Sequence, residues 1–284
     1  MIVVGGSIDG SSLDTTNLYV GPGVKLNKII GGSYCVSNDE KFKNHVGKVK
    51  LVVDGAESTN AITGAGIWSS TDEVEIEVKN AKAGGLGCQE CHRQGKTSNP
   101  TLEDADKKLG ANQWVKHSKI TCKDSEITVV YAAASNGFSY TKDAEIEIDG
   151  GTYEWYCTGQ SNGVVDNCSA VIANATIENF NHANRGHYGS GKSVIKGCTI
   201  AKFSVLGDPR ESDKDMADVR GTIAVDVDAD TVCPDFCVGA VSNVEVTTHK
   251  EAAKYIEYVK VSRDADITYT RNAVEILGDL LAIK

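Results

Sequence analysis

The sequence predicts an all-β chain that winds into a solenoid of stacked coils. Three observations support this class: strand-like alternation recurs along the chain, one short motif returns at a nearly fixed interval, and Gly, Asn, Asp and Ser separate the alternating runs. A unit of one or two strands cannot bury its apolar face alone, so a repeat of this length indicates coils that cover one another.

The repeat is clearest between residues 151 and 226. ATIENF occupies 175–180, CTIAKF 198–203 and GTIAVD 221–226, so the motif returns every 23 residues, and GTYEWY starts 24 residues before the first of these. Because equivalent strands of stacked coils lie about 4.8 Å apart, we expect one inward ladder of large side chains, with small side chains two positions earlier. The large members are Tyr153, Ile177, Ile200 and Ile223, and the small ones are Ala175, Cys198 and Gly221.

Further alternating runs before and after this region complete the series of predicted strands. Each run places apolar residues at every second position, as a strand with one buried face requires. Only in THKEAAKYIEYV, residues 248–259, is a helical pattern an alternative to a strand. In chain order the runs are KVKLVVDG from Lys48, EVEIEV from Glu73, SEITVV from Ser125, AEIEIDGG from Ala144, and YIEYVKVS, ADITYT and AVEIL near the C-terminus.

Two longer segments resemble the coils of right-handed parallel β-helix proteins. In GAGIWSSTDEVEIEVKNA from Gly64 and SNGFSYTKDAEIEIDGGT from Ser135, a glycine and an apolar residue precede a polar turn and an alternating strand. GGSIDGSS from Gly5 resembles the first-coil segment of that superfamily. The resemblance implies an all-β, right-handed parallel β-helix (solenoid) with coils of about 23 residues, forming a single domain over residues 1–284. Pectate lyases, polygalacturonases, viral tailspikes and bacterial adhesins share this fold, so it does not select a function.

Two segments interrupt the strand pattern, and we expect them to leave the coil as loops. Residues 84–117 carry many charges, one proline and a short helical pattern, TLEDADKKLG. Residues 206–218, LGDPRESDKDMAD, lie between two neighbouring coils. Loops of this length often carry function.

Charge and composition disfavour several classes of partner. The chain of 284 residues has a net charge of −10, so it lacks the basic excess that nucleic acid binding requires. It has no run of eighteen apolar residues, and MIVVGGSIDG lacks the features of a secretory signal peptide, so we expect no membrane insertion. Nine cysteines are an odd number in a chain large enough to fold without disulfides. Most should be free thiols, and several, such as Cys122 and Cys198, should be buried in strands.

A metal site is one hypothesis for the first loop. Cys88, Cys91 and His92 form the Cys-x-x-Cys-His pattern that attaches c-type haem, but haem is disfavoured because one match among nine cysteines arises easily by chance. The same two thiols could hold Zn²⁺ with His92 or His117, although structural zinc normally takes four ligands. Ca²⁺ bound by carboxylates is the other option. Its candidate ligands are Asp143, Glu145, Glu147, Asp149, Glu154 and Asp166.

The densest polar group is HANRGHY, residues 182–188. On an outer face such residues could bind an acidic sugar, and a basic side chain could abstract the proton next to a uronate carboxylate. If the chain is an enzyme, the candidate catalytic residues are His182, Arg185 and His187. The candidate carbohydrate contacts are Glu154, Asp166 and Tyr188. The alternative is that this segment is a solvated turn.

Two functions remain open. The first is a non-catalytic module of a virion or cell surface, tailspike-like or adhesin-like, that binds a polysaccharide or cell-surface glycan or assembles with protein partners. Exposed strand edges at a solenoid end invite pairing, so we expect a homo-oligomer, with a trimer as one form by analogy with tailspikes. The alternative is a polysaccharide lyase or glycoside hydrolase that acts on an acidic polysaccharide. The Asp-Asp and Gly-His-Gly motifs of polygalacturonases are missing, and residues 185–187 are the nearest match.

Overall fold

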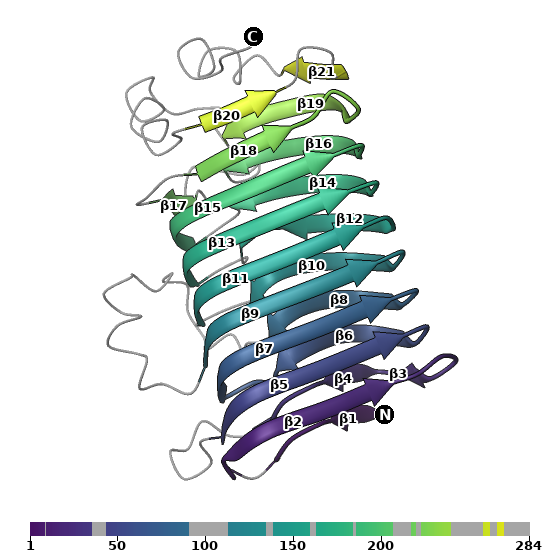
Figure 1. Ribbon diagram of the computed structural model, residues 1–284, viewed down its shortest axis with the longest axis vertical. Helices are drawn as coiled ribbons and strands as arrows, with labels where there is room; N and C mark the ends of the chain where they lie inside the picture. Colours follow the sequence, from purple (N-terminus) through teal and green to yellow (C-terminus); the bar gives the residue numbers. More distant parts are fainter. Residues whose placement is uncertain are drawn as a thin grey trace.

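Parallel strands in two long sheets make up the structure, a computed structural model (Figure 1). It describes residues 1–8, 10–35, 44–90, 113–134, 139–159, 163–183, 186–206, 217–219, 223–239, 258–261 and 266–269. Every strand pairing within these residues is parallel, and they contain no helix. None of the described residues therefore forms a helix long and apolar enough to cross a membrane. The predicted all-β class with stacked parallel strands is confirmed.

The chain alternates between the two sheets, so each rung of the stack takes one strand from each sheet (Figure 1). The ten-stranded sheet follows the order β2 (Leu13–Val20), β5 (Asn44–Asp54), β7 (Ser69–Lys79), β9 (Trp114–Lys123), β11 (Tyr140–Asp149), β13 (Val164–Ala173), β15 (Gly186–Lys196), β18 (Ile223–Val227) and β20 (Tyr258–Val261), with β17 (Ala217–Val219) also beside β15. The eleven-stranded sheet follows the order β1 (Ile2–Val4), β4 (Lys28–Ile30), β6 (Glu57–Ala65), β8 (Lys82–Gln89), β10 (Glu126–Ala134), β12 (Thr152–Cys157), β14 (Thr176–Ala183), β16 (Thr199–Leu206), β19 (Val232–Gly239) and β21 (Asp266–Tyr269), with β3 (Lys25–Leu26) also beside β6.

The two edges of the stack differ in their connections. From β5 to β16, each strand of the ten-stranded sheet passes to the next strand of the other sheet through two residues, and the first of these has a positive φ. Glycine, asparagine and aspartate tolerate this left-handed conformation, and they occupy every such position. These residues are Gly55, Asn80, Asp124, Gly150, Asn174 and Gly197. At the opposite edge the connections vary in length, and the longest joins β8 to β9.

The strand register confirms most of the predicted inward ladder. Tyr153 pairs with Ile177, and Ile177 pairs with Ile200, at offsets of 24 and 23 residues. The prediction is wrong for Ile223, which lies in β18 of the other sheet and pairs with Gly191 at an offset of 32 residues. The connection after β16 lengthens this rung, so the next strand on the ladder side is β19, where Val232 pairs with Thr199.

The predicted loop boundaries need correction. Residues 84–89 belong to β8 and residues 114–117 to β9, so the segment that leaves the first coil is shorter than 84–117. Its residues 91–112 lie outside the described part of the chain, as do 207–216 of the predicted second loop. Leu206 ends β16, and residues 217–218 belong to β17.

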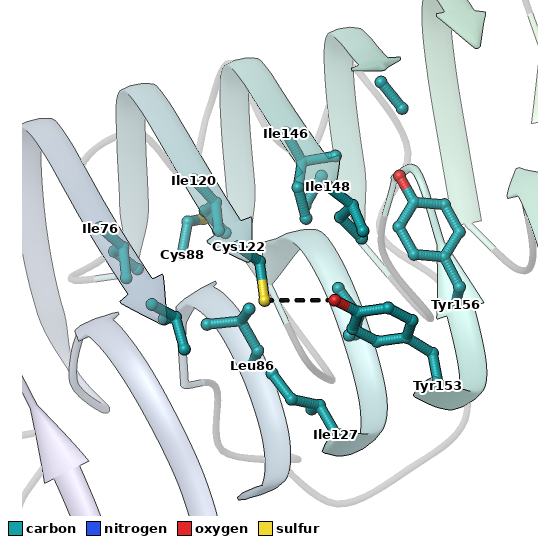
Figure 2. Close-up of a cluster of buried hydrophobic side chains, with 14 of the residues drawn as sticks. Ile76, Leu86, Cys88, Ile120, Cys122, Ile127, Ile146, Ile148, Tyr153 and Tyr156 are labelled. Carbon is teal, nitrogen blue, oxygen red and sulfur yellow. Dashed lines mark hydrogen bonds between the residues drawn. The ribbon is translucent and has the colours of Figure 1, made fainter. Parts of the chain in front are cut away.

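Apolar side chains from both sheets meet between them and form one continuous core (Figure 2). The Sγ atom of Cys122 lies 3.4 Å from the hydroxyl of Tyr153, across the gap between the sheets. Higher in the stack, the Phe180 ring lies between Tyr156 and Phe203, with ring centroids 5.1 Å and 4.3 Å apart. The seven cysteines whose side chains are described are all buried, as predicted for several of them.

Candidate functional site

The structure does not place the predicted catalytic group on an outer face. His182 is completely buried, with Nδ1 2.7 Å from the Ser193 hydroxyl and Nε2 3.8 Å from the Cys168 sulfur. Burial lowers the pKa of His182 to about 3, so its imidazole is neutral at physiological pH. Tyr188 is buried too, and its hydroxyl lies 4.0 Å from the Cys157 sulfur. The predicted outer-face roles of His182 and Tyr188 are therefore wrong.

The other two members of the predicted catalytic group receive little support. Arg185 lies outside the described residues. The backbone of His187 lies in β15 and pairs with Val164 of β13. Of the three predicted catalytic side chains, only that of His182 is described, and it is buried.

The predicted metal ligands do not form a site in the described residues. Cys88 is fully buried in β8, 3.9 Å from the Thr141 hydroxyl, and burial raises the pKa of its thiol to about 12. Its proposed co-ligands Cys91 and His92 lie outside the described residues. Across the described part of the chain, no three His, Cys, Asp or Glu side chains are grouped so that they could hold a metal ion. The structure does not group the predicted calcium ligands: Glu154 lies on a different sheet from the carboxylates of β11 and β13, and within the described residues the latter form no cluster of three.

Glu154 lies beside an open groove on the outer face of the eleven-stranded sheet. The groove has a volume of about 490 Å³ and crosses strands β6, β8, β10 and β12. We call it the rung groove. Its polar lining residues are Glu57, Ser58, Thr59, Lys82, Glu126, Thr128, Thr152 and Glu154.

The strand register explains how these residues come together. Glu57 pairs with Lys82, Lys82 with Glu126, and Glu126 with Thr152, so four consecutive rungs present one row of polar side chains. The Nζ atom of Lys82 lies 2.7 Å from Glu126 Oε2, and this hydrogen bond raises the pKa of Lys82. Glu154 follows Thr152 by two residues, so its side chain lies on the same face of β12.

At Gly84, the rung groove is lined by the backbone of β8 rather than by a side chain. Gly84 follows Ala83 and presents no side chain. A Cβ atom at this position would lie 2.6 Å from the backbone oxygen of Asn60, so only glycine fits without a shift of the strands.

A second group of polar side chains lies at the edge with variable connections. We call it the edge cluster, and its members are His45, Ser70, Asp72, Trp114 and Lys116. Nδ1 of His45 lies 3.0 Å from the Ser70 hydroxyl, and Nε2 lies 3.3 Å from Asp72 Oδ2. The Nζ atom of Lys116 lies 2.7 Å from the other Asp72 oxygen and 5.2 Å from the centre of the Trp114 ring.

Asp166, a predicted carbohydrate contact, belongs to the same outer surface as the edge cluster. It lies in β13, and its carboxylate accepts a hydrogen bond from the hydroxyl of Tyr140 in β11. Tyr140 pairs in register with Trp114 of the edge cluster. Asp166 and Glu154 therefore lie on different sheets and do not form one binding site.

Neither the rung groove nor the edge cluster is predicted by the local sequence pattern. The members of each are separated by 25 or more residues from one strand to the next, so only the register brings them together. The sequence does contain a signal for the groove. Glu57, Lys82 and Glu126 each begin an alternating run directly after a predicted turn. Aligning the strands on those turns would have placed Glu57, Lys82 and Glu126 on neighbouring rungs.

No family model, curated protein or solved structure matches this chain. The indications of function therefore come from the chemistry of the rung groove and the edge cluster.

Proposed function

We propose that the chain is a right-handed parallel β-helix module of the tailspike or adhesin kind, which binds a glycan in the rung groove and is non-catalytic toward that glycan. The observation that carries this proposal is the row of polar side chains across four consecutive rungs. A linear polymer laid along the stack meets an equivalent position about every 4.8 Å. Such a surface suits a polysaccharide, whose hydroxyl groups also recur along the chain.

The side chains of the groove fit the hydroxyl groups of sugars. Carboxylates of Glu126 and Glu154 accept hydrogen bonds, while the hydroxyls of Thr128 and Thr152 both donate and accept them. Gly84 lines the groove with its backbone alone, so no side chain of that residue separates a bound sugar from β8.

The charge of the groove points to a neutral glycan rather than an acidic one. Three glutamates line it, at positions 57, 126 and 154, against one lysine. That lysine, Lys82, is already paired with Glu126. Glu57 is paired with Lys25, 2.8 Å away, so among the described residues Glu154 is the groove glutamate without an ion-pair partner. A uronate would meet the negative charge of Glu154, which disfavours the acidic polysaccharide of the lyase alternative.

Hydrolysis is the second candidate, and one observation favours it. A glycosidase requires two carboxyl groups on either side of the scissile bond, one of them protonated. Glu126 and Glu154 lie on neighbouring strands of one face, and among the described residues Glu154 has no ion-pair partner. If the chain cleaves a neutral glycan that it binds, the hydrolase function replaces the proposed binding function.

Assembly of several copies is part of the same proposal. Within the described residues, β1 and β2 each form an end of their sheet, so their outer backbone groups are free for pairing. Exposed apolar side chains gather near these two strands, and they are Met1, Ile2, Ile8, Tyr19 and Val24. We propose a homo-oligomer at a virion or cell surface that covers this end, with a trimer as one form.

Retention on immobilised polysaccharides tests the proposal. The wild type should bind at least one neutral polysaccharide, and the double variant Glu126→Gln, Glu154→Gln should bind it at least tenfold more weakly. Glu147→Gln is the matched control, because Glu147 is an exposed glutamate on the outer face of the other sheet. The proposal fails if no neutral polysaccharide is retained, or if the double variant binds as well as the control. New reducing ends would instead identify a hydrolase.

A further inference from the structure

We propose that His45, Ser70 and Asp72 of the edge cluster form a nucleophile, base and carboxylate group that hydrolyses small carboxylic esters. This site lies on the ten-stranded sheet, whereas the rung groove lies on the other sheet. It is therefore independent of the proposed glycan binding, and each proposal can fail alone.

Two neighbouring parallel strands bring the three side chains together. His45 of β5 pairs in register with Ser70 of β7. Asp72 follows Ser70 by two residues on the same strand, so both side chains leave the same face. The imidazole of His45 lies between them, 3.0 Å from the Ser70 hydroxyl through Nδ1 and 3.3 Å from Asp72 Oδ2 through Nε2.

The carboxylate determines which imidazole nitrogen carries the proton. In neutral His45 the hydrogen belongs on Nε2, because only there can it be donated to Asp72. Nδ1 then presents a lone pair to Ser70 and can accept its proton, as a general base does. The Ser70 hydroxyl also lies 3.2 Å from the backbone oxygen of Asn44, so it has two acceptors within reach.

Asp72 is held in its ionised form. Burial pushes the pKa of Asp72 up, but hydrogen bonds and charges from Lys116 and His45 outweigh burial and lower it. The Nζ atom of Lys116 lies 2.7 Å from Asp72 Oδ1, which leaves Oδ2 for His45. Asp72 is therefore a positioning residue that orients the imidazole and stabilises its charged form during the reaction.

The surroundings fit a small acyl group. The side chains of His45 and Asp72 are 38% and 36% exposed, so solvent and substrate can reach the pair. Ser70 is only 8% exposed, which restricts access to compact groups. The Trp114 ring lies 5.6 Å from the His45 ring and gives this side of the site an apolar wall.

The reaction is a standard acyl transfer in two halves. Ser70 Oγ attacks the ester carbonyl carbon while its proton passes to Nδ1 of His45, and the tetrahedral intermediate collapses as the carbon–alkoxy bond breaks. The leaving alkoxide takes the proton from Nδ1 and departs as an alcohol. Water then attacks the acyl-serine with the same base, releasing the carboxylic acid and restoring Ser70.

Labelling with a fluorophosphonate and hydrolysis of p-nitrophenyl acetate test this inference on the whole chain. We expect stoichiometric labelling of Ser70, located by peptide mass spectrometry. Hydrolysis should fall at least 100-fold in Ser70→Ala and in His45→Gln. Asp72→Asn should lower kcat at least tenfold with little change in KM, because the imidazole of His45 loses the carboxylate that orients it. A merely structural role for Asp72 would leave kcat of the folded variant unchanged.

The chain contains a matched control for this test. His117 and Asp143 form a second histidine–carboxylate pair on the same sheet, 2.8 Å apart through Nδ1 of His117, with Asn167 rather than a serine next to them. His117→Gln should keep full labelling and hydrolysis. Because labelling of the wild type needs no variant, poor folding of Ser70→Ala cannot hide a negative result. Absence of label at Ser70, or equal hydrolysis by a folded Ser70→Ala, overturns the proposal.

Discussion

Nδ1 of His182 lies 2.7 Å from the hydroxyl of Ser193 in the interior between the sheets. The same hydroxyl lies 2.9 Å from that of Thr158, so the imidazole joins a buried chain of neutral hydrogen bonds. His182 is a structural residue, because nothing on the outer surface can reach it.

Acid should destabilise the fold through His182. Burial lowers its pKa to about 3, whereas an unfolded chain has a histidine pKa of 6.5. Between these values only the unfolded chain binds the proton, so stability is complete above about pH 6.5 and falls as the pH drops towards 3. The expected slope from this group is about 1.4 kcal/mol per pH unit.

Urea unfolding between pH 7 and pH 4 measures that slope. His182→Asn can keep the hydrogen bond to Ser193 but cannot titrate, so its stability should depend less on pH than that of the wild type. Equal slopes for the two proteins would show that His182 does not titrate as a buried group.

Gly191 should not tolerate alanine, because it faces His182. An added Cβ would lie 2.2 Å from Nε2 of His182 and 3.0 Å from the Cys168 sulfur. Overpacking of a core costs about 1–3 kcal/mol, so Gly191→Ala should lower the free energy of unfolding by that amount. Gly85→Ala is the control, since its Cβ would meet no atom closer than 3.6 Å. If both variants are equally stable, the close contact is absent.

Local pattern predicted the strands and most of the core, but it could not predict the register beyond an irregular connection. Tyr153, Ile177 and Ile200 stack as predicted because only two-residue turns and short connections separate their strands. Ile223 departs because the preceding connection has a different length, which no periodicity encodes. Neither the rung groove nor the edge cluster follows from local pattern, since each joins residues from different rungs.

The prediction of an outer-face position for His182 fails for a more local reason. Strict alternation from Ile177 would turn residue 182 outward, but β14 is buried at every residue from Asn179 to Ala183. Phe180 is buried as well, and counting by twos from it places His182 inside. A change of phase within a strand, as at a bulge, is therefore enough to reverse an assigned role.

The left-handed turn residues should respond to side-chain substitution. Asn174 has a φ of 56°, and a Cβ in this region costs about 1–2 kcal/mol unless the residue compensates locally. Asn174→Ala should therefore be about 1 kcal/mol less stable than Asn174→Gly in urea unfolding. Comparing these two variants with each other cancels the loss of the hydrogen bond from Asn174 to Asp149.

Gly197, in the turn between β15 and β16, provides an independent check of the left-handed turn conformation. It has a φ of 57°, and an added Cβ would meet its nearest atom at 3.4 Å, an ordinary contact. Any destabilisation of Gly197→Ala therefore reports the backbone conformation rather than a clash. An unchanged unfolding midpoint for Gly197→Ala would contradict the left-handed turn.

The stacked ring of Phe180 should be a major source of core stability. It contacts Tyr156 on one side and Phe203 on the other, and it is 1% exposed. Phe180→Ala should lower the free energy of unfolding by about 3–5 kcal/mol, because it leaves a cavity between three rungs. Val171→Thr, at a site 43% exposed, should change it by less than about 0.5 kcal/mol. A loss below 1 kcal/mol for Phe180→Ala would contradict the stacked arrangement.

The buried thiols should be almost inert in the folded chain. Burial raises the pKa of Cys88 to about 12 and also raises the pKa of Cys122 and Cys168. Since the thiolate is the reactive form, these cysteines should resist a disulfide reagent at pH 8. Of the nine cysteines, the seven shown to be buried should react only after unfolding, when all nine are titrated. Mass spectrometry of the native protein after brief exposure locates any adduct, and rapid modification of Cys88 or Cys168 would show that the sheets open in the native state.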